Sequence, residues 1–295
     1  MITDSFISRV SSYAALNGVS IDPYDTGVAD LSLASSRKTT DSRACLYQPT
    51  FCLILQGRKE VHVGATRHVF TPGDAVIVTH DVPMVSRITE ASVEAPYIAL
   101  SLPIALHTMR SLYSEIDEAA LEQEKGESFK VGKAEPALID AVSRLFALVK
   151  QPREARLIAP LIVKEIYFRL LLAPHGAMLR HLLQRGSAAG RVSKVIADIK
   201  QHYATSFTVD ELAATAMMSP SSFYENFKSI TATTPLQFQK DIRLLEARRL
   251  LMDTRQTVSA VAFEVGYQSP AQFSRDYSRK FGQSPRVDKK KLSFT

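Results

Sequence analysis

The stretch TVSAVAFEVGYQSPAQFSRDYSRKFGQSP, residues 257–285, repeats in outline the stretch TVDELAATAMMSPSSFYENFKSITATTP, residues 208–235. The opening Thr-Val pairs match at an offset of 49 residues, and the Ser-Pro pairs further along match at an offset of 50. One extra residue in the middle of the later unit explains the change of offset. A repeat of this kind predicts two copies of one supersecondary unit.

Each unit has the pattern of a helix, a tight turn and a second helix. Thr208 and Glu211 predict a capping box at the first helix, and Ser219-Pro220 predicts the start of the second, since proline is tolerated in a first turn. The later unit uses Gly266-Tyr267 as its turn and Ser269-Pro270 as the new start. A helix-turn-helix of this kind presents its second helix to the major groove of DNA.

Between the two units, residues 236–252 predict one long helix with Leu244, Ala247 and Leu251 in a single stripe. Seventeen helical residues span about 25 Å, so this helix is long enough to hold two recognition helices about one DNA turn apart. We expect the first helix-turn-helix at about 208–229, the linker helix at 236–252 and the second helix-turn-helix at about 257–281. Its arginines, Arg243, Arg248 and Arg249, are expected to form a solvated face.

The front of the chain predicts a β-rich domain. From about residue 31 to residue 101, short apolar runs such as FCLILQ (51–56), KEVHV (59–63) and AVIVT (75–79) are separated by turn residues. KEVHV alternates polar and apolar residues, as a strand with one buried face does, whereas AVIVT is apolar throughout. Even spacing of short strands favours a β-sandwich or small barrel.

After Pro103 the period becomes helical, and we expect helices at 105–123, 136–150 and 160–172. The third carries apolar residues on so many sides, including Leu161, Ile166 and Leu170, that it is expected to be buried nearly all round. The alternative is that part of this stripe is a dimer surface.

The net charge of +6 lies wholly at the back of the chain. Residues 1–190 hold 20 Lys and Arg against 20 Asp and Glu, and residues 191–295 hold 16 against 10. This distribution indicates that only the back contacts a polyanion, unless it is a solubility tail such as 289–291. Residues 186–190 (GSAAG) are a small-residue run that is expected to bury nothing, so we predict domains at 1–185 and 191–295 with 186–190 as linker.

Composition excludes several classes of protein. With 45% hydrophobic residues, 12 Gly and 14 Pro in 295, the chain is neither collagen-like nor disordered. Two cysteines exclude a disulfide framework and a four-cysteine zinc site. The chain has no signal-peptide core and no apolar run of about 20 residues, so we expect a cytoplasmic protein without a membrane partner.

The segment VGYQSPAQFSRDYSRKFGQSP (265–285) closely resembles the signature of AraC/XylS-type transcription regulators. The segment SPSSFYENFKSITATTPLQFQKDIRLLEARRLL (219–251) is similar to the first motif and linker helix of that family. TFCLILQGRKEVHVG (50–64), TPGDAVIV (71–78) and PLIVKEIYFRLLL (160–172) resemble the N-terminal domain of one subgroup. The resemblance implies an α+β chain, in which a cupin-like jelly roll with helices precedes an all-α double helix-turn-helix domain.

The resemblance also implies which residues meet DNA, because the family contacts bases from exposed positions early in each second helix. Those positions are Ser221, Ser222, Tyr224 and Glu225 in the first unit, with Lys228 near phosphate, and Ala271, Gln272, Ser274 and Arg275 in the second, with Arg279 near phosphate. A guanidinium such as that of Arg275 pairs with O6 and N7 of guanine. Gln272 has an alternative role, since it lies three residues after Ser269 and would complete a capping box. The aromatic residues expected in the core are Phe223, Phe227, Phe273, Tyr277 and Phe281.

Glu225 departs from the family's pattern, in which a basic or amide residue is common. A carboxylate near phosphates costs affinity unless it accepts a hydrogen bond from cytosine N4. The first motif is therefore expected either to bind DNA weakly or to contact a different base.

Cys45 and Cys52 are candidates for sensing electrophiles, because an exposed thiolate reacts with aldehydes or oxidants. The alternative is that both are small buried hydrophobes. If residues 45–52 stay extended, the seven-residue separation places the two thiols on opposite faces and disfavours a disulfide between them.

The function predicted is that of a sequence-specific DNA-binding transcription regulator, an effector-responsive activator that reads two adjacent major-groove segments with two recognition helices. Its partners would be double-stranded promoter DNA, with RNA polymerase, a small-molecule effector and a second copy of the chain as further candidates, in a nucleoid-associated location. A repressor and a ligand-independent activator remain alternatives. A general nucleoid-binding protein is disfavoured, because non-specific binders rely on denser basic charge.

An enzyme is not expected. His62, His68 and His80 do not form the His-x-His pair of metal-using cupins, and the sequence has no glycine-rich phosphate loop, nucleophile elbow or cysteine–histidine signature. We therefore predict no catalytic residue, no metal and no cofactor. The alternative, a cupin enzyme fused to a DNA-binding domain, lacks its metal triad.

Overall fold

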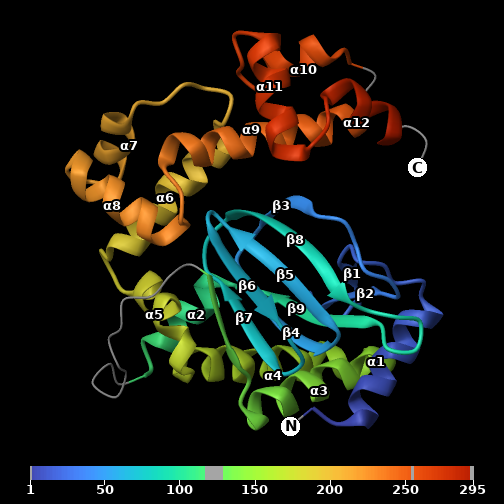
Figure 1. Ribbon diagram of the computed structural model, residues 1–295. Helices are drawn as coiled ribbons and strands as arrows, with labels where there is room; N and C mark the ends of the chain where they lie inside the picture. The colour runs from blue at the N-terminus through green and yellow to red at the C-terminus, as the bar shows by residue number, and fades with distance from the viewer. Residues whose placement is uncertain (1, 117–128, 254–255, 293–295) are drawn as a thin grey trace.

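The computed structural model describes residues 2–116, 129–253 and 256–292. Its first half contains two antiparallel sheets packed face to face (Figure 1). The larger sheet has the order β1 (Tyr24–Asp25), β2 (Ser32–Ser36), β9 (Tyr97–Pro103), β4 (Thr50–Gln56), β7 (Asp74–Val78) and β10 (Phe129–Lys133). The smaller has the order β3 (Arg43–Tyr47), β8 (Val82–Glu90), β5 (Arg58–Val63) and β6 (Thr66–Phe70). The expected sandwich and its strands are confirmed.

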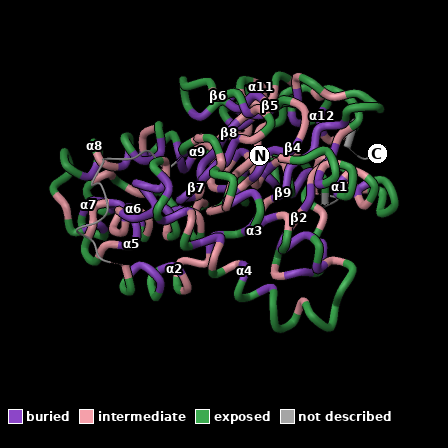
Figure 2. The backbone as a smooth tube through the Cα atoms, turned by 90° about the horizontal axis from the view of Figure 1, so that it is seen from below, coloured by how far each residue is buried: buried purple, intermediate pink, exposed green. Residues whose placement is uncertain are grey.

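The larger sheet is buried on both faces, which explains its nearly continuous apolar runs. In β4, Leu53 and Leu55 face the helices, whereas Ile54 faces the smaller sheet together with Val76 and Val78 of β7. Figure 2 shows buried residues concentrated along β4, β7 and β9. The core of this domain therefore has two layers, one between the sheets and one between the larger sheet and the helices.

The helices that cover the larger sheet are α1 (Asp4–Leu16), α3 (Pro136–Ala147) with the short 3-10 turn η2 (Leu148–Lys150), and α4 (Pro152–Leu172). The helix α2 (Leu106–Tyr113) is shorter than the expected 105–123, of which residues 117–123 lie outside the described residues. α4 begins eight residues earlier than predicted, with Pro160 inside it. The missing N–H of Pro160 leaves the carbonyl of exposed Arg156 to water.

α4 is not buried nearly all round, so that expectation was wrong. Ile166 and Leu170 are fully buried, but Leu161 is 63% exposed and Leu157 is 77% exposed. The helix packs on both α3 and α2, whereas Leu157, Leu161, Phe168 and Leu172 are exposed along another side.

The second half of the chain is helical, as predicted. Its elements are the turn η3 (Pro174–Gly176), α5 (Ala177–Leu183), α6 (Ala188–Gln201), α7 (Val209–Thr215), α8 (Pro220–Thr231), α9 (Pro235–Asp253), α10 (Val258–Glu264), α11 (Pro270–Phe281) and α12 (Pro285–Leu292). The helices α6, α7, α8 and the start of α9 surround one small core, and the end of α9 with α10 and α11 surrounds another. None of the described helices is long and apolar enough to cross a membrane.

The segment between the two halves is more ordered than its composition indicates. Ala188–Gly190 form the first turn of α6, which the Ser187 hydroxyl caps by accepting from the Gly190 N–H at 3.0 Å. Ala189 is fully buried, so the expectation that this run buries nothing was wrong. A division of the chain into domains at 186–190 stays a prediction.

Candidate nucleic-acid interface

The first helix-turn-helix consists of α7 and α8, and α7 begins with the predicted capping box. The Thr208 hydroxyl accepts from the Glu211 N–H at 3.2 Å, and the Glu211 carboxylate accepts from the Thr208 N–H at 2.8 Å. These hydrogen bonds hold the pKa of the Glu211 carboxyl below its usual range. After α7, Met217 adopts a φ of 51°. The Ser219 hydroxyl then caps α8 by accepting from the Ser222 N–H at 3.3 Å.

The second helix-turn-helix consists of α10 and α11 and has the expected extra residue in its turn. Thr257 caps α10 by accepting from the Ala260 N–H at 3.1 Å. Gly266 takes the left-handed conformation with a φ of 85°, and the Ser269 hydroxyl accepts from the Gln272 N–H at 3.4 Å. Only this serine half of a capping box forms at the described start of α11, so Gln272 does not complete one.

The five aromatic side chains expected in the cores pack there, with Phe281 only partly buried. Phe223, Phe227, Phe273 and Tyr277 are fully buried. Ring centroids lie 5.5 Å apart in the first pair and 5.5 Å apart in the second. Stacking on bases is therefore not a role for these rings, and each helix is left with a polar outer surface.

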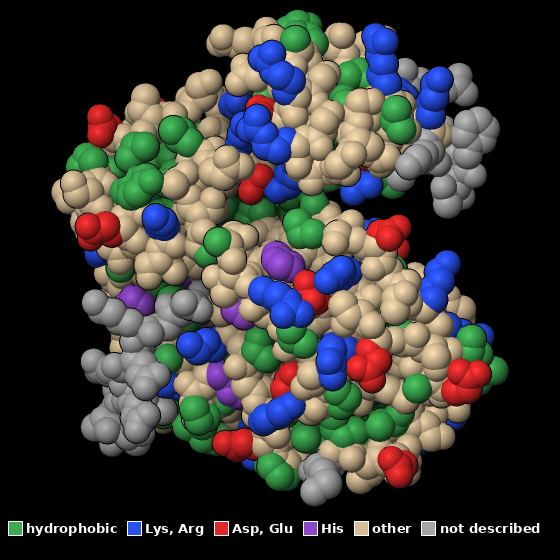
Figure 3. All heavy atoms as spheres, in the orientation of Figure 1, with side chains coloured by type: hydrophobic (Ala, Val, Ile, Leu, Met, Phe, Trp, Pro, Cys, Tyr) green, Lys and Arg blue, Asp and Glu red, His purple; other side chains and the backbone are tan. Residues whose placement is uncertain are grey.

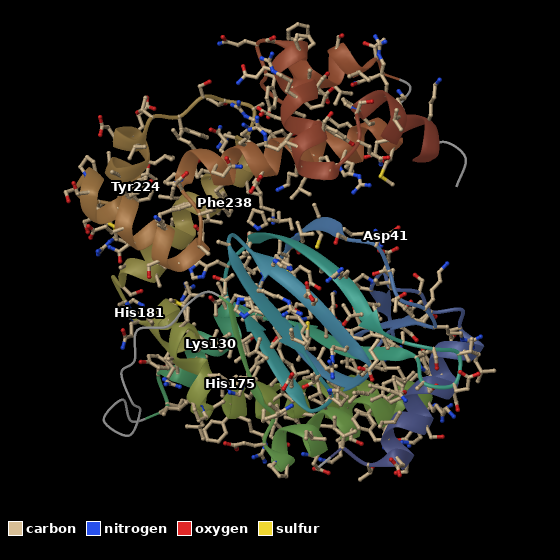
Figure 4. The ribbon with its side chains drawn as sticks, in the orientation of Figure 1. Asp41, Lys130, His175, His181, Tyr224 and Phe238 are labelled. Atoms are coloured by element: carbon tan, nitrogen blue, oxygen red, sulfur yellow. The ribbon has the colours of Figure 1, made fainter. Side chains whose placement is uncertain are left out.

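The structure places most of the predicted DNA-contacting residues on those outer surfaces. Exposed positions are Ser221, Ser222, Tyr224, Glu225 and Lys228 on α8, and Ala271, Gln272, Arg275 and Arg279 on α11. Ser274 is half-buried, and its hydroxyl donates to the Pro270 carbonyl at 2.9 Å. Figure 4 labels Tyr224 on α8, where it is 40% exposed, and Phe238 on α9, where it is fully buried. Contact of these residues with DNA stays a prediction.

The linker-helix arginines do not form a solvated face, so that expectation was wrong for two of the three. Arg243 donates to the backbone carbonyls of Tyr203 and Gly266. Arg248 pairs with buried Asp288 at 3.0 Å and lies 4.9 Å from the centroid of the Phe281 ring. Arg249 pairs with Glu246 and has a side chain that is 57% exposed. Which face of a helix meets solvent depends on neighbours that are distant in sequence.

The outer face of α8 lies beside the β-rich domain. Glu225 and Lys228 line a cleft of about 450 Å³, whose opposite wall includes Val63, His68 and Phe129. The tip of the β5–β6 hairpin touches the end of α8, since a Cβ on Gly64 would lie 2.5 Å from the Ala232 carbonyl oxygen. Figure 3 shows basic and histidine side chains along the boundary between the two halves of the molecule. Two of the predicted DNA-contacting residues therefore face the β-rich domain in this arrangement.

The turn between β7 and β8 holds α6 in place. Asp81 pairs with Lys200 at 2.7 Å, and His80 Nε2 lies 3.3 Å from the Ala189 carbonyl oxygen. Because a carbonyl only accepts, Nε2 carries the ring proton, and Nδ1 accepts from the Thr79 hydroxyl at 2.8 Å. Burial lowers the pKa of His80 to about 4. This contact joins residues 109 positions apart, so the sequence near His80 gives no signal for it.

Cys45 and Cys52 do not lie on one extended segment, so the geometry assumed for them was wrong. Pro49 separates β3 from β4, and the two strands belong to different sheets. Both thiols pack against the core between the sheets and are free. Burial raises the pKa of Cys45 and raises that of Cys52 to about 11, which disfavours the reactive thiolate at neutral pH. Sensing by these cysteines stays a prediction.

Potential metal ligands are also dispersed. Within the described residues, no three His, Cys, Asp or Glu side chains come together in a way that would hold a metal ion. His62 instead pairs with buried Glu60 at 2.8 Å, alongside Arg67 and Arg87.

The chain matches two protein-family models. The AraC-type transcriptional regulator N-terminus matches residues 27–178, and a helix-turn-helix domain matches residues 212–291. The first match alone covers more than half of the 295 residues.

Curated relatives and solved structures agree with these matches. The HTH-type transcriptional activator RhaS of Escherichia coli O1:K1 / APEC is 27% identical over 151 residues, which are 51% of this chain and 54% of RhaS. The virulence regulon transcriptional activator VirF of Yersinia enterocolitica is 24% identical over 184 residues, 61% of this chain and 65% of VirF. The chain thus spans roughly half to two thirds of the length of these relatives.

The fold also resembles that of ToxT from Vibrio cholerae strain SCE256, whose crystal structure contains an unsaturated fatty acid. The TM-score is 0.56 at 12% identity, over 90% of this chain and 96% of ToxT. At this identity the similarity concerns the fold alone.

Proposed function

The chain belongs to the family of AraC-type transcriptional regulators, and from this we propose that it is a sequence-specific DNA-binding transcription regulator that acts as an effector-responsive activator. Its recognition helices would be α8 and α11, inserted into two adjacent major-groove segments.

The observation that supports this function best is the pairing of two helix-turn-helix units on one continuous helix. α9 is a single 19-residue helix, and each unit has an outer helix with aromatic residues inside and polar residues outside. A buried aromatic side holds each recognition helix rigidly, and an exposed polar side is what base edges and phosphates can meet.

The residues have distinct proposed roles. Arg275 would pair with guanine, because its exposed guanidinium forms a two-pronged donor. Lys228 and Arg279 would contact phosphates, and the Arg279 side chain is 78% exposed although it lies 3.7 Å from Asp276. Glu225 would weaken the contact of α8 with DNA or select cytosine.

Regulation by a small molecule is supported by the cleft between α8 and the β-rich domain. A ligand bound there, or a change in the β5–β6 hairpin, would alter the access of DNA to Glu225 and Lys228. RNA polymerase and a second copy of the chain are the other proposed partners, and the exposed apolar side of α4 is the surface that we propose for the second copy. We propose a nucleoid-associated cytoplasmic location and no catalytic step.

Footprinting on the DNA that flanks the protein's own gene tests this function, with and without candidate metabolites. We expect protection of two direct elements about one helical turn apart, changed in strength by an effector. Protection that ignored sequence would contradict the proposed function and favour general DNA coating.

A further inference from the structure

The linker helix α9 passes between two cores that lie on different sides of it. Phe238 and Ile242 pack in the core of the first unit, and Leu244 and Leu251 pack in the core of the second. Neighbouring residues in a helix point about 100° apart, so the apolar face changes sides between residues 242 and 244. Arg243 is the residue at which this change occurs.

The guanidinium of Arg243 joins the two helix-turn-helix units. Its Nε donates to the Tyr203 carbonyl at 2.7 Å, and one terminal nitrogen donates to the carbonyls of Ala204 at 3.1 Å and Thr205 at 3.0 Å. The other terminal nitrogen donates to the Gly266 carbonyl at 3.1 Å. One side chain thus holds the loop between α6 and α7 against the turn between α10 and α11.

The two segments that Arg243 joins are already in contact. A Cβ on Gly266 would lie 2.2 Å from the Ala204 carbonyl oxygen, so only glycine allows this approach. Gln239, which is 6% exposed, adds a donor to the Tyr203 carbonyl at 3.0 Å and another to Thr205. At this junction, the side chains of Arg243 and Gln239 therefore supply the hydrogen bonds that the backbone carbonyls accept.

Two ion pairs fix α11 on α9 next to this junction. Lys240 of α9 pairs with buried Asp276 of α11 at 2.8 Å, and Asp241 of α9 pairs with Lys280 of α11 at 2.7 Å. Along α9 the cation Lys240 precedes the anion Asp241, and along α11 the anion Asp276 precedes the cation Lys280. This complementary order specifies one register of α11 along α9. Because these pairs hold α11 on α9, any change in the relative orientation of the two units would have to occur at the Arg243 junction.

We propose that Arg243 is the positioning residue that sets the separation and relative rotation of α8 and α11, and thereby the spacing of the two DNA elements that the protein accepts. This rests on the proposed function for its DNA consequence, but the geometric part concerns the free protein alone. Lysine would not replace it, because an ammonium group lacks the planar fork that donates to the carbonyls of both segments at once.

A distance measurement on the DNA-free full chain tests the geometric part. Spin labels at Asp210 and Ser259, exposed and equivalent positions in the two units, would be introduced in a background with Cys45→Ala and Cys52→Ala. We expect a narrow distance distribution that Arg243→Lys and Arg243→Met broaden or shift. Arg249→Lys is the matched control, because it changes an arginine of the same helix whose partner is Glu246. An unchanged distribution in the Arg243 variants would overturn the proposal.

Binding to DNA with altered spacing tests the consequence. Duplexes would carry the two footprinted elements at their natural separation or with one or two base pairs inserted between them. We expect wild type and Arg249→Lys to prefer the natural spacing, and Arg243→Lys to lose about tenfold of that preference while keeping its affinity for a single element. An unchanged spacing preference in Arg243→Lys would overturn the inference. Absence of specific DNA binding by wild type would instead contradict the proposed function. In that case the distance measurement alone would test the role of Arg243.

Circular dichroism and thermal unfolding identify variants that fail to fold. If Arg243→Met fails to fold, Arg243→Lys still tests the proposal.

Discussion

Met217 and Gly266 occupy equivalent positions in the turns of the two helix-turn-helix units, and both have a left-handed backbone, with φ of 51° and 85°. Their surroundings differ. Met217 is 75% exposed, whereas a Cβ on Gly266 would lie 2.2 Å from the Ala204 carbonyl oxygen. The first turn is therefore free at the surface, and the second is pressed against the loop of the other unit.

Gly266→Ala is expected to destabilise the protein, and Met217→Ala is expected to have little effect. Alanine at 266 would have to adopt a left-handed backbone, which costs about 1–2 kcal/mol, and would in addition clash with Ala204. Met217 already has a Cβ in that conformation, so its truncation removes only exposed atoms. Chemical unfolding of both variants measures the difference. Equal stabilities would contradict both the backbone cost and the clash.

Arg275→Ala is expected to weaken specific DNA binding by about 1–3 kcal/mol and to relax the sequence preference at one position. The reason is the loss of the two-pronged contact to guanine. Arg279→Ala is the control, because loss of a phosphate contact weakens binding to specific and random DNA alike. Competition binding against both kinds of DNA measures the two effects. An equal loss on both DNAs for Arg275→Ala would leave it a phosphate contact.

Glu225→Gln is expected to strengthen DNA binding by up to about 1 kcal/mol, because it removes a negative charge near phosphates. The side chain is exposed, so folding should not change. Titrations with a duplex of the footprinted site at several salt concentrations provide the measurement. Weaker binding of Glu225→Gln would indicate instead that the carboxylate accepts a hydrogen bond from a cytosine.

Much of the fold could be predicted because its signals are local. The capping box of Thr208 and Glu211 lies within one helical turn, and the strands have turn residues at their ends. The linker helix, expected at 236–252, runs from Pro235 to Asp253. These features depend on residues a few positions apart, so a single sequence contains what is needed to recognise them.

The roles of single side chains in tertiary contacts could not be predicted in the same way. Arg243 bonds to carbonyls about 40 residues earlier in the chain, and nothing near it in sequence indicates that loop. Leu161 has the same character as its buried neighbours, yet no element of the described chain covers it. One local signal of the junction exists, namely the change of the apolar stripe of α9 from residues 238 and 242 to residues 244, 247 and 251.

The exposed apolar side of α4 leads to a prediction about self-association. Leu157, Leu161, Phe168 and Leu172 are all more than 40% exposed and recur along one side of the helix. Exposed apolar surface of this kind is stabilised by burial against a partner. We expect Leu161→Glu to convert a dimer to a monomer in sedimentation velocity without lowering the unfolding temperature of the monomer. A wild-type chain that sediments as a monomer at micromolar concentration would contradict this.

Stability at mildly acidic pH is expected to depend on His80. Its pKa is lowered by burial from 6.5 to about 4, so the imidazole is neutral in the folded protein at pH 5, whereas in the unfolded chain it is mostly protonated. The unfolded state therefore binds more protons between these two values, and the free energy of unfolding falls as the pH decreases from about 7 to about 4. The shift corresponds to about 3 kcal/mol over this range.

His80→Gln isolates this contribution from those of the carboxylates that titrate in the same range. Glutamine can still donate a hydrogen bond to the Ala189 carbonyl but has no proton to gain, so we expect the variant to lose less stability than wild type between pH 7 and pH 4. The comparison is made by urea unfolding at each pH, and His202→Gln serves as control because His202 is exposed at the end of α6. Parallel pH profiles for wild type and His80→Gln would show that the ring becomes protonated without leaving its site, and that the contact between the β7–β8 turn and α6 does not require neutral histidine.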